Sequence, residues 1–122
     1  MDNERQQSWD WQFECARDFD DSCDNDRTWP PPILSALVTA VHATTLRRLH
    51  PFTSHARLCL STSPRSWEPG VRNAPAFISL DPAGHYNIWS GDPYTNSPTL
   101  VLETRDPAQA AAQLEQLLAA WA

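Results

Sequence analysis

Apolar residues recur at helical spacing in two stretches of the chain. Over residues 33–48 they fall at i, i+3, i+4 and i+7, and Pro51 follows shortly after the stretch ends. Over residues 107–121 a second apolar stripe follows Asp106 and Pro107, a typical helix N-cap with proline at the first helical position. Both patterns predict a helix with one buried face.

Alternating apolar and polar residues predict four strands, over residues 56–61, 76–80, 85–90 and 99–104. The second and third are joined by Asp81-Pro82-Ala83-Gly84, whose aspartate, proline and glycine positions are typical of a type I turn. The predicted fold is α+β, with the order α-ββββ-α. A four-stranded antiparallel sheet would carry two helices on one face.

The first 28 residues differ from the rest in composition. They hold nine acidic residues and three arginines, so they carry the whole net charge of −6, whereas residues 29–122 are neutral. This composition predicts a disordered acidic arm, 1–28, before a single α+β domain, 29–122. Trp9, Trp11 and Phe13 alternate in the arm and would share one face of an extended strand. The arm either docks on the domain or binds a partner through its rings and acids.

Composition also argues against several function classes. The neutral domain has no basic excess for nucleic acid. Lysine is absent, and the three glycines at 70, 84 and 91 form no phosphate-binding loop, so no nucleotide cofactor is expected. No apolar run is long enough to span a membrane, and the acidic start from Met1 to Glu4 lacks the features of a secretory signal. We therefore expect a cytoplasmic protein.

The densest polar cluster, His50 with Thr53, Ser54 and His55, lies between the first helix and the first strand. The favoured interpretation is structural, with turn hydrogen bonds from the hydroxyls and one histidine capping helix carbonyls. Ligand binding and catalysis by Ser54 with His55 are the alternatives, although no glycine elbow flanks the serine.

Other candidate groups are scattered. Glu68 and Asp92, each on a predicted loop, are the remaining candidate acid–base pair. The histidines and cysteines show no zinc-like spacing, so no metal site is expected, and the odd cysteine count predicts reduced thiols.

Aromatic residues suggest a binding surface. His85 and Trp89 alternate with Tyr86 along one strand, so they would lie on the open face of the sheet if the helices cover Tyr86. Trp67 and Tyr94 lie on the loops 62–75 and 91–98, which leave the same end of the sheet. The predicted ligand- or partner-binding residues are His50, Trp67, His85, Trp89 and Tyr94. Alternatively, the arm covers this face.

The segment LRRLHPFTSHARL, residues 46–58, resembles the centre of a bacterial family of unknown function whose members are described only as natural-product biosynthesis proteins. The family pattern is L-R-x-L, a hydrophobic residue, then P-F-x-S-H-x-x-L-x-F-S, followed by a loop with a tryptophan, a strand pair and an alanine-rich helix. The matching positions are Pro51, Phe52, Ser54, His55, Leu58 and Ser61, with Trp67 fitting the loop tryptophan. His50 and Leu60 depart from it. The likeness covers residues 33–122 and leaves the arm outside.

The resemblance implies a biosynthetic gene cluster and no established reaction. We expect an accessory protein that binds a small-molecule or peptide intermediate, or a biosynthetic enzyme. One alternative is a cofactor-independent cyclase or hydrolase using His55 with Ser54, Glu68 or Asp92. Another is an immunity-type inhibitor that blocks a toxin with its acidic arm.

Overall fold

The described residues form one antiparallel sheet of five strands, in which each strand pairs with the next along the chain. The computed structural model describes residues 3–26, 33–54, 56–63, 68–92, 97–119 and 121. The strands are β1 (His50–Ser54), β2 (Arg57–Ser61), β3 (Ala76–Leu80), β4 (Tyr86–Ser90) and β5 (Thr99–Thr104), in spatial order β1-β2-β3-β4-β5. The sheet is therefore an up-and-down meander with β1 and β5 at its edges.

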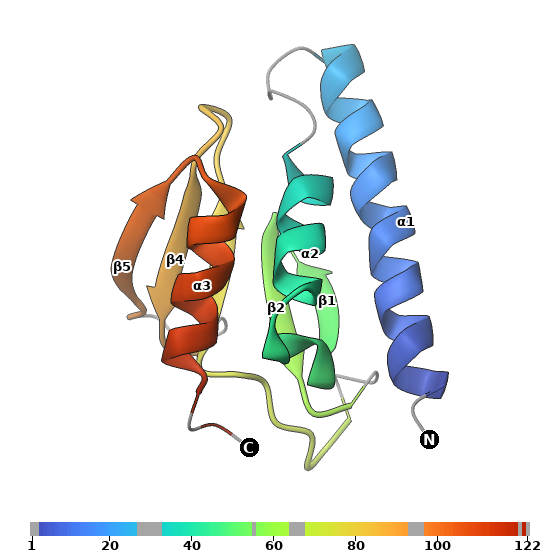
Figure 1. The fold of residues 1–122 in the computed structure, drawn as a ribbon, viewed down its shortest axis with the longest axis vertical. Coiled ribbons are helices and arrows are strands. Elements are labelled where there is room, and N and C mark those ends of the chain that lie inside the picture. The colour runs from blue at the N-terminus through green and yellow to red at the C-terminus, as the bar shows by residue number, and fades with distance from the viewer. Residues whose placement is uncertain are drawn as a thin grey trace.

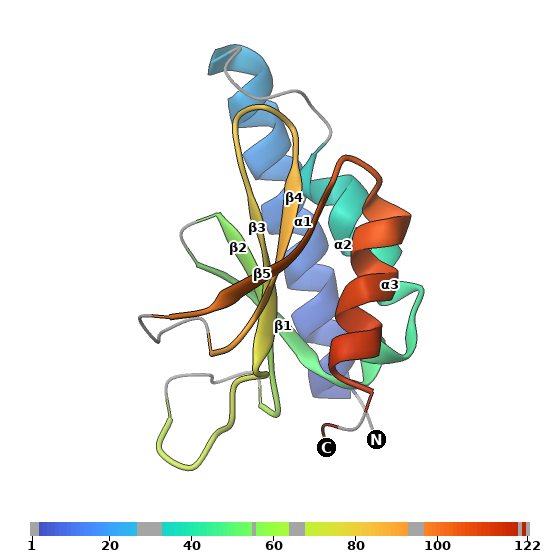
Figure 2. The same ribbon diagram turned by 90° about the vertical axis from the view of Figure 1, so that its left-hand side faces the viewer.

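The described α-helices all lie on one face of this sheet (Figures 1 and 2). They are α1 (Asn3–Asp26), α2 (Leu34–His42) and α3 (Pro107–Leu117). Helices α2 and α3 lie next to each other over the sheet, and α1 lies beyond α2 and against β1. The fold class is α+β as predicted, with one more strand and one more helix than expected.

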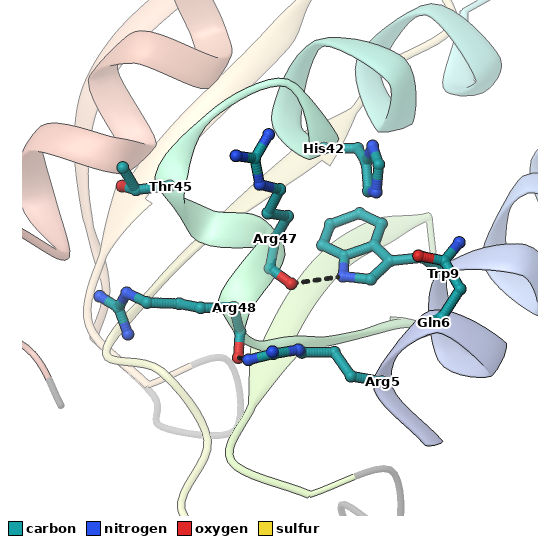
Figure 3. A pocket seen from close by; sticks show the side chains of 7 residues that line it. All are labelled: Arg5, Gln6, Trp9, His42, Thr45, Arg47 and Arg48. Atoms are coloured by element: carbon teal, nitrogen blue, oxygen red, sulfur yellow. Dashed lines mark hydrogen bonds between the residues drawn. The ribbon is translucent and has the colours of Figure 1, made fainter. Parts of the chain in front are cut away.

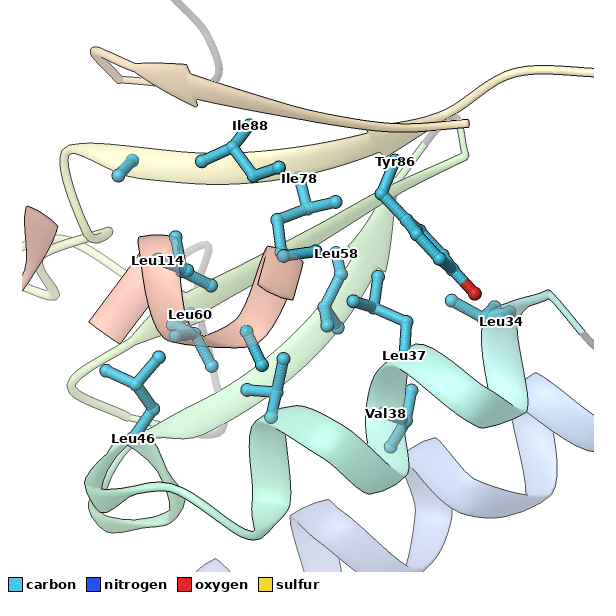
Figure 4. Packing of buried hydrophobic residues seen from close by; sticks show 14 of the residues in the cluster. Leu34, Leu37, Val38, Leu46, Leu58, Leu60, Ile78, Tyr86, Ile88 and Leu114 are labelled. Carbon is cyan, nitrogen blue, oxygen red and sulfur yellow. The ribbon is translucent and has the colours of Figure 1, made fainter. Parts of the chain in front are cut away.

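The core lies between the sheet and the helices, where apolar residues from alternate strand positions meet the helix stripes (Figure 4). Leu37 of α2, Ile78 of β3 and Leu114 of α3 are fully buried there. Tyr86 is buried too, and its hydroxyl donates to the carbonyl of Ile33 at the start of α2. Burial raises the pKa of Tyr86 to about 12, which keeps this donor protonated.

The predicted first helix, residues 33–48, is two elements. Helix α2 ends at His42, and a 3₁₀ helix, η1 (Thr45–Arg48), follows after Thr44, whose hydroxyl accepts from the backbone N–H of Leu46. A threonine that caps a new helix in this way competes with continuation of the preceding one.

The segment after η1 was predicted as a connector and is the edge strand β1. It pairs along its whole length with β2, with Phe52 opposite Cys59 and Thr53 opposite Leu58. Pro51 is compatible with this position because an edge strand need not donate on both sides.

The prediction of a disordered arm is wrong for residues 3–26, which form α1. Trp9 and Ala16 of this helix are buried in the core, and Phe13 and Phe19 pack against it. Trp11 remains 67 % exposed, so the alternating aromatics do not share a face. The buried side of α1 also contains Gln12 and Asp20, two polar residues that hide the helical stripe in the sequence.

Asp20 explains how α1 is fixed to α2. Its carboxylate accepts from the backbone N–H groups of Ile33, Leu34 and Ser35, at 3.1, 2.9 and 3.0 Å. These are N–H groups that a helix start leaves without intrahelical partners, and Ile33 at the N-cap offers no side-chain acceptor. The capping carboxylate of α2 therefore comes from a different helix.

Two local predictions are confirmed. The turn between β3 and β4 closes through the N–H of Gly84 to the carbonyl of Asp81, at 3.0 Å. Helix α3 begins at Pro107, and the Asp106 side chain accepts from the N–H of Ala108. None of the helices in the described ranges has the length and apolar character needed to cross a membrane.

Candidate functional site

A pocket of about 450 Å³ opens where the start of α1 meets the end of α2 and η1 (Figure 3). We call it the basic pocket, because three of its lining residues are arginines. It is lined by Arg5, Gln6, Trp9, His42, Thr45, Arg47 and Arg48. The volume is within the usual range for small-molecule sites.

Trp9 fixes the wall of the basic pocket that α1 supplies. Its indole N–H donates to the carbonyls of Arg47 and Leu49, at 3.0 Å each. Its ring lies edge-on to the His42 ring, with centroids 5.0 Å apart. Because Trp9 is only 1 % exposed, these contacts hold the two walls at a defined separation.

The arginines of the pocket have different partners. Arg5 Nη1 donates to the Arg48 carbonyl at 2.8 Å, and Arg48 Nη2 donates to the Trp121 carbonyl at 3.0 Å. Arg47 is exposed, and its guanidinium makes no hydrogen bond or ion pair with any described residue. In Figure 3 this guanidinium lies on the His42 side of the pocket, whereas the Arg48 side chain extends away from Trp9.

None of the seven described lining residues is acidic. Glu115 of α3 lies at the Thr45 side and accepts from the Thr45 backbone N–H and hydroxyl, at 2.8 and 2.6 Å. These hydrogen bonds lower the pKa of Glu115. Glu115 is therefore ionised at neutral pH, and its charge lies at this side of the pocket, bonded to Thr45.

The opposite face of the sheet carries an aromatic stack. Trp89 lies opposite Phe77, with ring centroids 6.2 Å apart and planes 14° from parallel. The Arg57 guanidinium lies 5.5 Å from the Phe77 centroid, and the Trp89 indole N–H donates to Ser79 Oγ at 2.9 Å. The helices cover Tyr86, which was the condition for Trp89 to lie on the open face of the sheet. The indole N–H of Trp89, however, is already bonded to Ser79.

His85 belongs to a polar cluster at the β3–β4 turn. Its Nδ1 lies 3.4 Å from Asp81 Oδ1, and Arg105 Nε donates to its Nε2 at 3.2 Å. Ligand atoms of Asp81, His85 and Glu103 lie within 4.8 Å of one another, a set that no sequence spacing indicated. Burial raises the pKa of Asp81, but hydrogen bonds from the His85 backbone, Asn87 and the Ala83 backbone outweigh it and lower the pKa overall. The contacts of Asp81 are those of a turn residue.

The predicted histidine cap at the end of the first helix is wrong for His50. Its Nδ1 lies 3.0 Å from Ser8 Oγ of α1, and the carbonyls of Arg47 and Leu49 accept from Trp9 instead. Thr53 likewise accepts from Gln12 of α1. These junction residues position α1.

The remaining predicted site residues are only partly described. His55, Trp67, Tyr94 and the side chain of Ser54 lie outside the described residues. The loops after β2 and β4 do meet, because the Gly91 N–H donates to the Pro75 carbonyl at 2.8 Å.

The proposed acid–base pair lies on these two loops. Glu68 is exposed on the first, and Asp92 is half-buried on the second.

Burial, and to a smaller extent Asp92, raises the pKa of Cys59 to about 12, although Arg57 opposes the change. Cys59 is therefore an unreactive thiol at neutral pH.

Comparison with known proteins gives one match, a family of unknown function (DUF6193) whose model covers residues 9–119. The chain belongs to DUF6193. The match begins at Trp9, so α1 is part of the DUF6193 unit, contrary to the resemblance that left the first 28 residues outside. Neither the curated proteins nor the solved structures gave a match.

The DUF6193 match also covers most of the basic pocket. Trp9, His42, Thr45, Arg47 and Arg48 lie inside it, and Arg5 and Gln6 precede it. Sequence reasoning missed this pocket because its residues come from a helix taken for a disordered arm and from the end of a helix taken as continuous. The clearest signal in the sequence is the pair Arg47-Arg48, two adjacent arginines within residues 29–122, whose net charge is zero.

Proposed function

We propose that this DUF6193 protein is a binding protein that holds a small-molecule intermediate of a bacterial natural-product pathway in the basic pocket. The observation that carries the proposal is a pocket of about 450 Å³ with a buried indole wall and one guanidinium, that of Arg47, which no described residue engages. The pathway rests on the likeness of the Pro51-Phe52-x-Ser54-His55 motif to natural-product biosynthesis proteins.

The chemistry of the pocket supports binding over catalysis. Its described lining offers guanidinium, imidazole and amide groups, which orient a ligand by hydrogen bonds and charge. The Thr45 hydroxyl donates to Glu115, but the lowered pKa of that carboxylate makes it a weak general base. The alternative cyclase or hydrolase depends on His55, which lies outside the described residues.

A pair of glutamines allows a direct test. Gln6 lines the pocket, whereas Gln7 is exposed on α1 and does not line it. Gln6→Trp would fill the pocket, and Gln7→Trp adds the same ring outside it. Each purified protein is incubated with a small-molecule extract of the source bacterium, and retained compounds are identified by mass spectrometry after denaturation.

We expect the wild-type protein and Gln7→Trp to retain the same compound and Gln6→Trp to lose it. Retention of nothing by the wild-type protein, or equal retention by Gln6→Trp, would contradict the proposal. Circular dichroism of both variants shows whether the fold is intact.

A further inference from the structure

The basic pocket concentrates positive charge in an acidic chain. The protein carries a net charge of −6, yet three of its nine arginines line this one pocket. Arg48 donates to the carbonyls of Leu118 and Trp121, which are neutral groups and leave its charge uncancelled. The Arg47 guanidinium has no hydrogen-bond or ion-pair partner among the described residues.

Two carboxylates near the lining residues, Glu115 and Asp10, accept hydrogen bonds from neutral donors. Glu115 accepts from Thr45, and Asp10 accepts from Gln6 Nε2 at 2.9 Å. Glu115 forms both of these hydrogen bonds with Thr45, only two positions before Arg47. The contacts among the described residues therefore leave the Arg47 guanidinium available to a ligand, while these two carboxylates keep their charge and bond to neutral donors.

We infer that the basic pocket recognises the phosphate group of a small organic phosphate ester. This inference rests on the proposed function and names its ligand class. A guanidinium donates two parallel hydrogen bonds to a phosphate, which matches the planar geometry of Arg47. His42 and Gln6 supply further donors from the facing walls, and the volume exceeds what a phosphate ion fills, leaving room for an organic group beside Trp9.

Arginines at this position also have a structural explanation. Arg47 and Arg48 are the last residues of η1 and lie near the end of α2, where cations favourably oppose the helix dipole. Substituting Arg47 removes this dipole interaction from the free and the ligand-bound protein alike, so it changes stability but not affinity. A loss of affinity therefore reports recognition of the ligand.

The test uses calorimetric titration with phenyl phosphate, inorganic phosphate and phenol. The variant is Arg47→Gln, and the matched control is Arg17→Gln, which removes an exposed arginine of α1 outside the pocket. We expect saturable binding of phenyl phosphate that Arg47→Gln weakens about tenfold or more and Arg17→Gln leaves unchanged. Inorganic phosphate should bind more weakly, and phenol should not bind.

Absence of saturable phenyl phosphate binding, or equal affinity in Arg47→Gln, would overturn the inference. If inorganic phosphate binds as tightly as phenyl phosphate, the ligand is the free ion and the proposal of a phosphate ester is wrong. If the extract experiment yields a neutral compound while phenyl phosphate fails to bind, the binding function stands and the phosphate inference falls.

Discussion

Trp9 and Trp11 lie two positions apart in one helix, yet truncating them should change the stability of the protein by very different amounts. Trp9 is 1 % exposed and donates to two backbone carbonyls, whereas Trp11 is 67 % exposed. If α1 is an integral helix, Trp9→Ala removes core packing and Trp11→Ala removes almost none.

The expected magnitude follows from these environments. Truncating a buried tryptophan to alanine costs about 3–5 kcal/mol, a large part of the 5–15 kcal/mol typical of a domain. At about 4 °C per kcal/mol for a chain of this size, Trp9→Ala should lower the melting temperature by roughly 12–20 °C. Trp9→Phe keeps most of the packing but not the indole N–H, and should cost about 1–2 kcal/mol. Trp11→Ala should change stability by less than about 0.5 kcal/mol.

Urea unfolding followed by far-ultraviolet circular dichroism is the suitable assay, because tryptophan fluorescence changes with the substitution itself. Equal midpoints for Trp9→Ala and Trp11→Ala would refute the docking of α1. Deletion of residues 1–28 with little change in melting temperature would refute it independently and restore the disordered-arm prediction.

Three further substitutions test separate contacts. Asp20→Ala should cost roughly 2–3 kcal/mol in urea unfolding because three N–H groups of residues 33–35 lose their acceptor, whereas Asp21→Ala, on an exposed neighbour, should change little. Asp81 has a lowered pKa, so its stabilising effect is present above the unfolded value of about 3.9 and is lost as pH falls through the folded pKa. The difference in urea midpoint between wild-type protein and Asp81→Ala should therefore shrink below about pH 4, and a constant difference would contradict this. Trp89→Ala should lower the urea midpoint by removing the Phe77 stack while leaving the compound retained from extract unchanged; lost retention with normal stability would instead favour the open-face surface.

The first helix could not be recognised by apolar periodicity alone. Its buried side follows helical spacing through Trp9, Gln12, Ala16 and Asp20, but two of these are polar. Gln12 and Asp20 are buried because they bond to Thr53 and to the start of α2. Those partners are distant in sequence, so composition predicted disorder where tertiary contacts produce a helix.

Elements fixed by local chemistry were predicted well. The turn after Asp81 and the cap at Asp106 each depend on hydrogen bonds within a few residues, and both are present. The extra strand β1 was missed because Pro51 and its polar neighbours lack a strand pattern and pair only through β2. The basic pocket was missed for a related reason, since Arg5 and Arg48 approach each other only after α1 docks.

The position of the basic pocket also links its occupancy to folding. One wall comes from α1 and the other from η1, with the contact from Arg5 to Arg48 spanning 43 residues of sequence. A ligand that touches both walls binds only the docked state, and at a hundred times its dissociation constant it would stabilise that state by about 2.7 kcal/mol. Slower amide hydrogen exchange along α1 would then report occupancy for any ligand, including one whose chemistry is unknown.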